Sequence, residues 1–393
     1  MSAGRTLRRV GELLPYRVDV AEEVLTDLAE RLRRTRLPDE VPPAAAEDWS
    51  QGMPLAYLRG VLDYWQGGYD WRAAEAEING YEQFVTVVEQ QPIHFLHVRS
   101  PHEGAVPLLL IHGWPGSLVE FLDVIAPLTD PPDPADAFHV VVPSLPGYGC
   151  SVPLVGQGWN ARTIAPLFAE VMRRLGYDGY GVQGGDWGAV VAYNLAEQFA
   201  DRVLGMHVNL MNVPLPKGET PAPPTEWMRR VGAAGGGYDA ILGTRPQTMG
   251  YLLDDSPAGL AAFLIEKFHE WVDPARSLAE TISLDRLLTN VMLYWVNRTG
   301  ASSARLYWEK RIAPKTQFPQ SYVGVPTGVA NFPGELIRSR RTDAERHFNI
   351  VHWTEPSQGG HFPSLEVPGA FTADVREFFR PLRLSAGLAK VTN

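Results

Sequence analysis

The stretch that decides the fold is VQGGDWGAVVAYNLA, residues 182–196. An apolar run leads into it, an alanine-rich amphipathic run leaves it, and Gly184, Gly185 and Gly188 lie at the junction. This pattern predicts a strand, a sharp turn and a helix. In the G-x-S-x-G form of such a turn, the middle residue is an exposed nucleophile. Here that residue is Asp186, so the turn presents a carboxylate.

Composition and charge narrow the class of protein. The chain has 393 residues, which predicts two or three structural units. The net charge is −10, without a long run of one sign, which argues against nucleic acid or an anionic membrane as a partner. Cys150 is the single cysteine, the N-terminus has no apolar signal-peptide core, and no segment reaches the roughly 18 apolar residues of a membrane span. These features predict a cytoplasmic protein that is not attached to a membrane.

The pattern on both sides of the turn predicts an α/β architecture. Short apolar runs alternate with amphipathic runs, which is typical of a mostly parallel sheet with helices on both faces. Two helices, expected at residues 20–37 and 55–68, and a β-hairpin precede this part. A helical block interrupts the later strands and predicts a cap over the carboxyl edge of the sheet, where ligands bind in open α/β folds. The predicted units are an N-terminal helical unit with its hairpin (1–95), a first core part (96–213), a cap (214–320) and a second core part (321–393).

A second motif lies directly after the strand VPLLLI. It reads HGWPGS, residues 112–117. In α/β-hydrolase folds the loop at this place gives one backbone N–H to an oxyanion hole, and the residue after the nucleophile gives the other. The two donors would be the amides of Trp114 and Trp187. The alternative is an ordinary tight turn, which the run His-Gly-x-Pro at this place disfavours.

A base and an acid are expected after the nucleophile, because the chain order in this fold is nucleophile, acid, histidine. His361 follows the strand pattern FNIVHW, and Glu335 follows the strand pattern SYVGVPTGVA. Alternatively, His361 is a surface histidine and Glu335 is a glutamate at the start of a helix. His352 lies within its strand and His112 within its loop, so both are expected to be structural. Three further acids stay open as alternatives to Glu335: Asp343, Glu345 and Glu355.

The carboxylate nucleophile indicates the reaction. A serine that attacked an sp³ carbon would form an ether, which offers no carbonyl group for water to attack. Asp186 would form an ester instead, and water activated by a histidine can hydrolyse an ester with help from the oxyanion hole. The sequence therefore predicts substitution at carbon through an alkyl-enzyme intermediate, in which the leaving group is either an epoxide oxygen or a halide.

The leaving group separates two reactions. An alkoxide that leaves an epoxide needs a proton donor, and tyrosines of the cap suit this task; a halide needs only N–H donors, such as the indole of Trp187. Tyr238 and Tyr307 are the candidate proton donors, although a tyrosine in an amphipathic helix is often only packed. Other tyrosines that stay open as donors are Tyr251, Tyr294 and Tyr322.

These motifs resemble the microsomal-type epoxide hydrolases of the α/β-hydrolase superfamily. The resemblance covers almost the whole chain, and its segments include HGWPGS, LPGYGCS, GGDWGA, FPGEL and GGHFPSLEVP. The N-terminal segment PYRVDVAEEVLTDLAERLRRTRLPDE is specific to this branch. The resemblance implies hydrolysis of an epoxide to a vicinal diol.

The resemblance also assigns a role to each candidate residue. It implies that Asp186 is the nucleophile, His361 the base and Glu335 the acid that supports the base. Tyr238 and Tyr307 match the two cap tyrosines that polarise the epoxide oxygen. Trp114 matches the oxyanion loop.

The implied partners are a small-molecule epoxide and water, without a cofactor or metal. Membrane-bound members carry an N-terminal anchor, whereas this chain starts at the helical unit, so no membrane attachment is expected. A homodimer is an open expectation. Bacterial members of this branch include enzymes of secondary-metabolite (antibiotic) pathways such as enediyne biosynthesis, and the alanine-, arginine- and glycine-rich composition hints at a bacterial source. Substrate selectivity is expected to depend on four cap tryptophans: Trp227, Trp271, Trp295 and Trp308.

Two other functions stay open at this stage. One is a dehalogenase with an aspartate nucleophile, which the N-terminal unit and the paired tyrosines disfavour. The other is a hydrolase-fold protein that only binds a ligand, which would be expected to lack a member of the triad. The stretch GGDWG lacks the lysine of a phosphate-binding loop, and the histidines lack zinc-ligand spacing.

Overall fold

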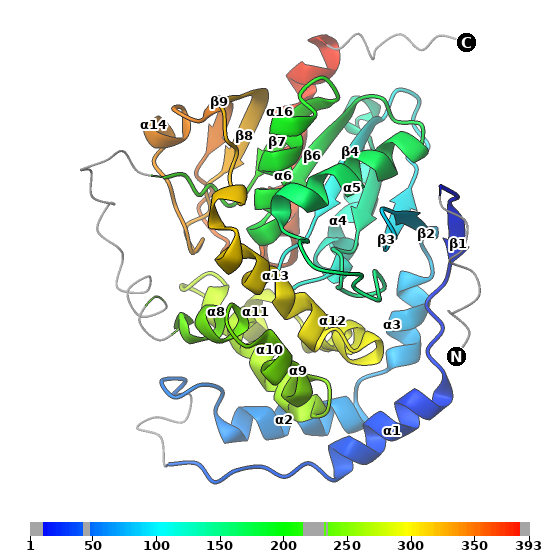
Figure 1. Cartoon of the computed structure of the whole chain (residues 1–393), viewed down its shortest axis with the longest axis vertical. Helices are drawn as coiled ribbons and strands as arrows, with labels where there is room; N and C mark the ends of the chain where they lie inside the picture. The colour runs from blue at the N-terminus through cyan, green and yellow to red at the C-terminus, as the bar shows by residue number, and fades with distance from the viewer. Residues whose placement is uncertain (1–10, 42–47, 215–231, 233–234, 386–393) are drawn as a thin grey trace.

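The computed structural model describes residues 11–41, 48–214, 232 and 235–385. Across these residues a single sheet of nine strands runs in the order β1-β2-β3-β5-β4-β6-β7-β8-β9 (Figure 1). The strands are β1 (Leu14–Tyr16), β2 (Gln83–Val88), β3 (Gln91–Val98), β4 (Val106–Ile111), β5 (Phe138–Pro143), β6 (Tyr180–Gly184), β7 (Val203–Val208), β8 (Val323–Ala330) and β9 (Phe348–Thr354).

The sheet is mostly parallel, as the sequence predicted. Strands β1, β2 and β3 form an antiparallel edge that joins β5, and the strands from β4 to β9 run parallel to one another. Ile111 at the end of β4 pairs with Gly184 at the end of β6. Because parallel strands end at the same edge, the loops that follow these two residues lie next to each other.

Helices cover both faces of the sheet. Residues 181 and 184 of β6 point to opposite faces; a Cβ on Gly181 would meet Phe379 of α16, whereas a Cβ on Gly184 would meet Gly188 of α6. Helix α5 packs on α6, and α4 packs on α16. The core helices are α4 (Leu122–Thr129), α5 (Ala161–Arg174), α6 (Asp186–Gln198), α14 (Arg341–Ala344), α15 (Pro363–Glu366) and α16 (Pro368–Ser385), with the 3₁₀ turns η1 (Leu118–Phe121), η2 (Pro134–Asp136) and η3 (Pro314–Thr316).

A helical cap lies over the carboxyl edge of the parallel strands (Figure 1). The N-terminal helices wrap around its outer side, because α1 and α2 pack against α10, and α3 packs against α12. The cap helices are α8 (Gly237–Leu242), α9 (Pro246–Leu253), α10 (Pro257–Trp271), α11 (Leu278–Thr281), α12 (Leu284–Asn297) and α13 (Gly300–Ile312), and the N-terminal helices are α1 (Glu22–Arg33), α2 (Leu55–Gly67) and α3 (Trp71–Ile78).

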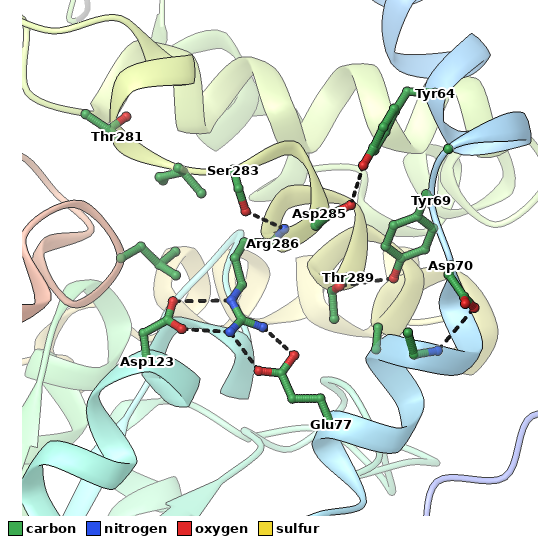
Figure 2. A pocket seen from close by; sticks show the side chains of 15 residues that line it. Tyr64, Tyr69, Asp70, Glu77, Asp123, Thr281, Ser283, Asp285, Arg286 and Thr289 are labelled. Carbon is green, nitrogen blue, oxygen red and sulfur yellow. Dashed lines mark hydrogen bonds and ion pairs between the residues drawn. The ribbon is translucent and has the colours of Figure 1, made fainter.

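Arg286 of α12 joins the cap to both other parts of the molecule. Its guanidinium binds both carboxylate oxygens of Glu77 in α3 at 2.7 Å and those of Asp123 in α4 at 2.7 and 3.2 Å (Figure 2). The hydroxyl of Tyr64 in α2 donates to Asp285 at 2.8 Å beside these pairs. A polar cavity of about 620 Å³ lies among these side chains. The cap is therefore held by charged contacts as well as by apolar packing.

Some local predictions differ from the structure. Helix α1 is shorter than the stretch 20–37, because the chain leaves the helix after Arg33, well before Pro38. Strand β1 and helices α3 and α16 were not predicted. Trp227 lies outside the described residues, and the division into four units remains a prediction. In the described ranges, no helix combines the length and the apolar character that crossing a bilayer requires.

Candidate active site

The turn at Asp186 has the geometry of a nucleophile elbow. Gly184 ends β6, Asp186 begins α6, and Asp186 has a φ of 48°, a left-handed value that is rare for a residue with a side chain. A Cβ on Gly188 would lie 1.9 Å from the carbonyl oxygen of Ile111. Only glycine therefore permits this close approach of α6 to β4. The side chain of Asp186 is 22% exposed, so a small molecule can reach it.

The HGWPGS loop holds one oxygen of this carboxylate. The backbone N–H of Trp114 donates to Oδ1 of Asp186 at 2.8 Å. His112 braces the loop: its Nε2 accepts the amide of Leu145 at 3.1 Å, and its Nδ1 contacts the carbonyl oxygen of Gly113 at 2.9 Å. Burial lowers the pKa of His112 to about 4, so the ring is neutral and can accept and donate in this way. The structural role expected for His112 agrees with these contacts.

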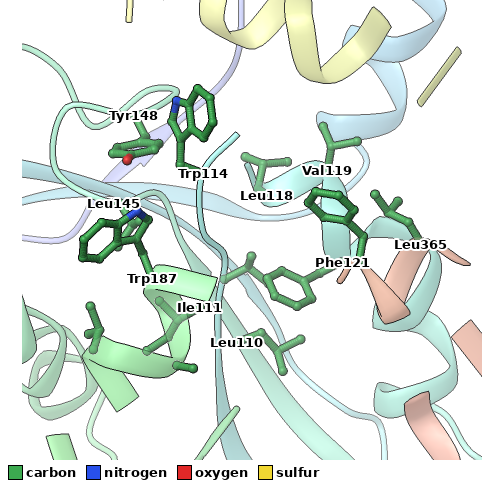
Figure 3. Close-up of a cluster of buried hydrophobic side chains, with 14 of the residues drawn as sticks. Leu110, Ile111, Trp114, Leu118, Val119, Phe121, Leu145, Tyr148, Trp187 and Leu365 are labelled. Atoms are coloured by element: carbon green, nitrogen blue, oxygen red, sulfur yellow. The ribbon is translucent and has the colours of Figure 1, made fainter. Parts of the chain in front are cut away.

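The second expected amide belongs to Trp187. This residue follows Asp186 in the first turn of α6, where backbone N–H groups have no partner inside the helix. Its indole meets the ring of Tyr307 edge-on, with ring centroids 5.2 Å apart. Trp114 and Trp187 both belong to the main apolar core, which backs the site (Figure 3). The oxyanion role of the Trp187 amide remains a prediction.

His361 lies between Glu335 and the nucleophile. Its Nδ1 is 2.7 Å from Oε1 of Glu335, and its Nε2 is 3.5 Å from Oδ2 of Asp186. The backbone N–H of His361 donates to the carbonyl oxygen of Trp271, which ties the loop after β9 to the cap. Glu335 is fully buried, and its Oε1 also accepts the amide of Leu336 at 2.6 Å. The structure thus brings together all three residues that the sequence singled out as a triad.

Charge controls the protonation of this histidine. Burial opposes a charge on His361, but the carboxylates of Glu335 and Asp186 outweigh burial and raise its pKa well above the ordinary value. Burial likewise raises the pKa of Glu335, and His361 lowers it. The imidazolium form is therefore favoured as long as Asp186 carries its negative charge.

Tyr238 and Tyr307 reach the site from the cap. Their ring centroids are 5.6 Å apart, and the two rings meet edge-on at 81°. Tyr238 stacks on Trp114 with centroids 5.2 Å apart, and Tyr307 meets Trp187 edge-on at 5.2 Å. Burial raises the pKa of both tyrosines, so each keeps its proton at neutral pH. Both can therefore act as hydrogen-bond donors above the nucleophile.

A cavity of about 240 Å³ opens onto Asp186 from the cap side. Apolar side chains form much of its wall, and Asn212, Asp239 and Lys310 add polar groups. Its residues are Asp186, Trp187, Val190, Leu210, Asn212, Tyr238, Asp239, Tyr307, Lys310, Pro314, Gln317, Phe318, Leu336 and Ile337. Within the described residues, no cluster of three histidine, cysteine or acidic side chains could hold a metal ion.

The alternative acids and tyrosines lie elsewhere. The three acids pair with other side chains: Asp343 with Arg340, Glu345 with Arg341, and Glu355 with Asn331. Tyr251 and Tyr322 are exposed, at 69% and 57%. Tyr294 is buried, and its hydroxyl donates to the carbonyl oxygen of Gly116 at 2.8 Å, which braces the oxyanion loop.

Two buried ionisable residues at the site were not predicted. Glu120 of η1 lies beneath the oxyanion loop, since a Cβ on Gly116 would be 1.6 Å from its Oε1. Burial raises the pKa of Glu120 to about 8. Lys267 of α10 is 3% exposed and lies over the ring of Tyr238. Its position in the apolar helix AAFLIEKFHEW, four residues from an aromatic residue on either side, is a signal that could have revealed it.

Comparison with known proteins decides the family. A Stigmatella aurantiaca protein whose name assigns it to the epoxide hydrolases is 44% identical over 382 residues, which is 94% of this chain and 86% of the relative. The chain belongs to the epoxide hydrolase family. Epoxide hydrolase 1 of Sus scrofa is 33% identical over 404 residues, covering 93% of this chain and 88% of that protein.

Family models and solved structures agree with this membership. Residues 13–121 match the model for the epoxide hydrolase N terminus, and residues 106–239 match the model for the alpha/beta hydrolase fold. The juvenile hormone epoxide hydrolase of Bombyx mori superposes with a TM-score of 0.86 at 30% identity, over 95% of this chain and 96% of that one. The Aspergillus niger epoxide hydrolase superposes with a TM-score of 0.83 at 30% identity, over 94% of this chain and 97% of that one. The α/β-hydrolase fold and the enzyme class predicted from the sequence, an epoxide hydrolase, are confirmed.

Proposed function

We propose that this epoxide hydrolase converts its substrate into a vicinal diol through an ester on Asp186. The observation that carries this assignment is the Trp114 amide on Oδ1 of Asp186, 2.8 Å away, with His361 on the other side of the same carboxylate. A carboxylate held in this way can attack carbon and then become a carbonyl group whose oxygen already has a donor.

In the first step, Oδ2 of Asp186 attacks an epoxide carbon. A C–O bond forms between the enzyme and the substrate, and the C–O bond of the ring breaks. The departing oxygen takes a proton from the hydroxyl of Tyr238 or Tyr307, both of which line the cavity at the nucleophile. The product of this step is a hydroxyalkyl ester.

In the second step, His361 removes a proton from water, and the resulting hydroxide adds to the ester carbonyl. The amides of Trp114 and Trp187 stabilise the oxyanion. Glu335 fixes the ring through Nδ1 and stabilises the imidazolium, with 2.7 Å between the two groups. Collapse of the tetrahedral intermediate releases the diol and restores the carboxylate of Asp186.

The charge on Asp186 couples the two steps. In the free enzyme this charge helps to raise the pKa of His361. Esterification removes the charge, so the pKa of His361 falls. The proton that the imidazolium then releases restores the tyrosine that donated in the first step, and the neutral imidazole becomes available. His361 therefore becomes a base at the point where the ester on Asp186 has formed and must be hydrolysed.

The site favours an epoxide over a halide as the leaving group. The cavity wall beside Asp186 carries the two tyrosines Tyr238 and Tyr307 as well as the indole of Trp187. Paired tyrosine hydroxyls can give a proton to an alkoxide, which a halide does not require. A dehalogenase and a protein that only binds ligands are the competing functions that the experiment below addresses.

Several finer properties are proposed on the sequence alone. They are a cytoplasmic location, a homodimer, no membrane attachment, and a role in bacterial secondary metabolism such as antibiotic biosynthesis. The 240 Å³ cavity suits a small epoxide with an apolar body.

The test compares styrene oxide with a haloalkane under the same conditions. We expect phenylethanediol from styrene oxide and no halide release from the haloalkane. One turnover of styrene oxide in ¹⁸O-water then distinguishes the covalent route, because the first diol should carry oxygen from Asp186 while the label stays on the enzyme. Label in the first-turnover diol would mean that water attacks the epoxide directly, and the covalent mechanism would be wrong.

A further inference from the structure

Helix α10 presents one side to the active site. Phe263, Lys267 and Trp271 are spaced by four residues and therefore share a face. The ring of Phe263 contacts that of Trp114, with centroids 5.7 Å apart. Trp271 contacts Trp114 at 6.1 Å and Tyr238 at 5.3 Å. The middle member of this row is a lysine, where packing alone would favour another apolar side chain.

The ammonium group of Lys267 is buried and fixed. The residue is 3% exposed, and Nζ lies 2.5 Å from Glu266 and 2.8 Å from Glu270. The same Nζ lies 5.4 Å from the ring centroid of Tyr238. Burial of a charge is costly even when it is paired, and apolar replacements of buried ion pairs are often neutral or stabilising. Stability therefore gives little reason for a lysine at this place.

We propose that Lys267 is a positioning residue that acts through Tyr238, holding its ring and strengthening its hydroxyl as a proton donor to the departing epoxide oxygen. This inference rests on the proposed function, in which Tyr238 is a donor. A cation within about 6 Å of an aromatic face is attracted to it, and more strongly where water is excluded. Negative charge that develops on the phenol oxygen during donation is stabilised by the same cation.

The neighbouring carboxylates are the charges that Lys267 would oppose. The pKa of Tyr238 is raised by burial first, and also by the carboxylates of Asp186, Asp239 and Glu270. Lys267 pairs with Glu270 and so offsets the carboxylate that acts from its own helix. Loss of the ammonium would remove an attractive charge and leave that carboxylate unopposed. Both effects weaken Tyr238 as a donor.

The experiment measures ring opening alone. All variants are built in the His361→Gln background, where the ester is expected to accumulate, and its formation from styrene oxide is followed by rapid quench and intact-mass measurement. Lys267→Met is expected to slow ester formation about 10-fold when Tyr238 is present. With Tyr238→Phe in the same chain, Lys267→Met should change the rate less than about 2-fold, because the group it acts through is gone.

Three controls accompany this double-mutant cycle. Lys267→Arg keeps the charge and should restore most of the rate. Arg202→Met removes a cation 5.6 Å from the ring of Tyr180, at the opposite edge of the sheet, and should leave the rate unchanged. If Lys267→Met does not fold, Lys267→Gln takes its place in both backgrounds.

The outcomes separate this inference from the proposed function. A wild-type rate in Lys267→Met overturns the inference, and so does an equal slowing with and without the Tyr238 hydroxyl, which would mean a general effect on the cap. If Tyr238→Phe alone slows ester formation in either case, the proposed role of Tyr238 stands. If the His361→Gln parent forms no ester on Asp186, the proposed function itself is wrong, and the inference falls with it.

Discussion

The backbone amide of Trp114 and the imidazole of His361 approach different oxygens of one carboxylate. Trp114 donates to Oδ1 of Asp186 at 2.8 Å, and Nε2 of His361 lies 3.5 Å from Oδ2. The two oxygens are therefore distinguished before any substrate binds. Under the proposed function, Oδ2 forms the new bond and Oδ1 becomes the ester carbonyl oxygen.

Asp186→Asn should abolish diol formation, because a neutral amide is a poor nucleophile. The contacts of the turn are preserved, since the side-chain carbonyl can still accept the Trp114 amide. We expect a loss of turnover of at least about 10⁴-fold in freshly purified protein, measured with styrene oxide. Mass spectrometry must exclude deamidation. Full activity in a protein that still carries asparagine would remove Asp186 from the nucleophile role.

His361→Gln should open the epoxide once and then stop. Ring opening needs the carboxylate of Asp186 and the tyrosine donors, but it does not need His361 as a base. Ester hydrolysis needs the base. Intact mass should increase by one substrate, and peptide mapping should place the addition on Asp186. Continued turnover by this variant would show that another group activates the water.

Replacing Tyr238 or Tyr307 with phenylalanine should slow ring opening. Each is proposed to supply one donor to the departing oxygen, and loss of one such donor costs roughly 10²-fold. The double variant should be slower than either single variant, because one tyrosine can partly serve for the other. Single-turnover rates of ester formation measure this. Wild-type rates in all three variants would mean that the protons come from another part of the cap.

Glu120→Gln should change how stability depends on pH. Burial raises the pKa of Glu120 from 4.5 to about 8. The charge on His361 lowers this pKa, and the carboxylate of Asp186 raises it further. The folded protein then binds more protons than the unfolded chain between these values, so this group lowers the free energy of unfolding as pH rises from about 4.5 to about 8. Glutamine removes this contribution.

Urea unfolding at about pH 5 and about pH 8 measures the difference between Glu120→Gln and wild type. The variant should gain stability relative to wild type as pH rises between these values. Glu366, whose pKa burial raises to about 7, is present in both proteins and cancels in the comparison. An equal difference at both pH values would contradict the raised pKa of Glu120.

Much of the site could be predicted because its signals are local. Gly184, Asp186 and Gly188 specify the elbow through backbone geometry and close helix packing, which residue types reveal directly. His361 and Glu335 follow from the rule that parallel strands deliver their loops to one edge. Their contact, 2.7 Å between side chains 26 residues apart, agrees with that rule.

Other features could not be predicted because they depend on packing between distant segments. Strand β1 has only three residues, and one of them is a proline. It forms because it pairs with β2, about 70 residues later in the chain. Glu120 looks like an ordinary surface charge in the sequence, and only the contact of η1 with the oxyanion loop shows that it is buried. Helix α3, in contrast, carries a local signal, since Asp70 accepts the amide of Ala73 as an N-cap.

The double pairing of Arg286 has a consequence for how firmly the cap is held. Glu77 and Asp123 bind the same guanidinium from two different parts of the chain, so tilting the cap at α12 would break both ion pairs in one motion. The two carboxylates are 41% and 40% exposed, so dissolved salt screens these pairs. The attachment of α12 to α3 and α4 is thus expected to weaken as the ionic strength of the medium rises.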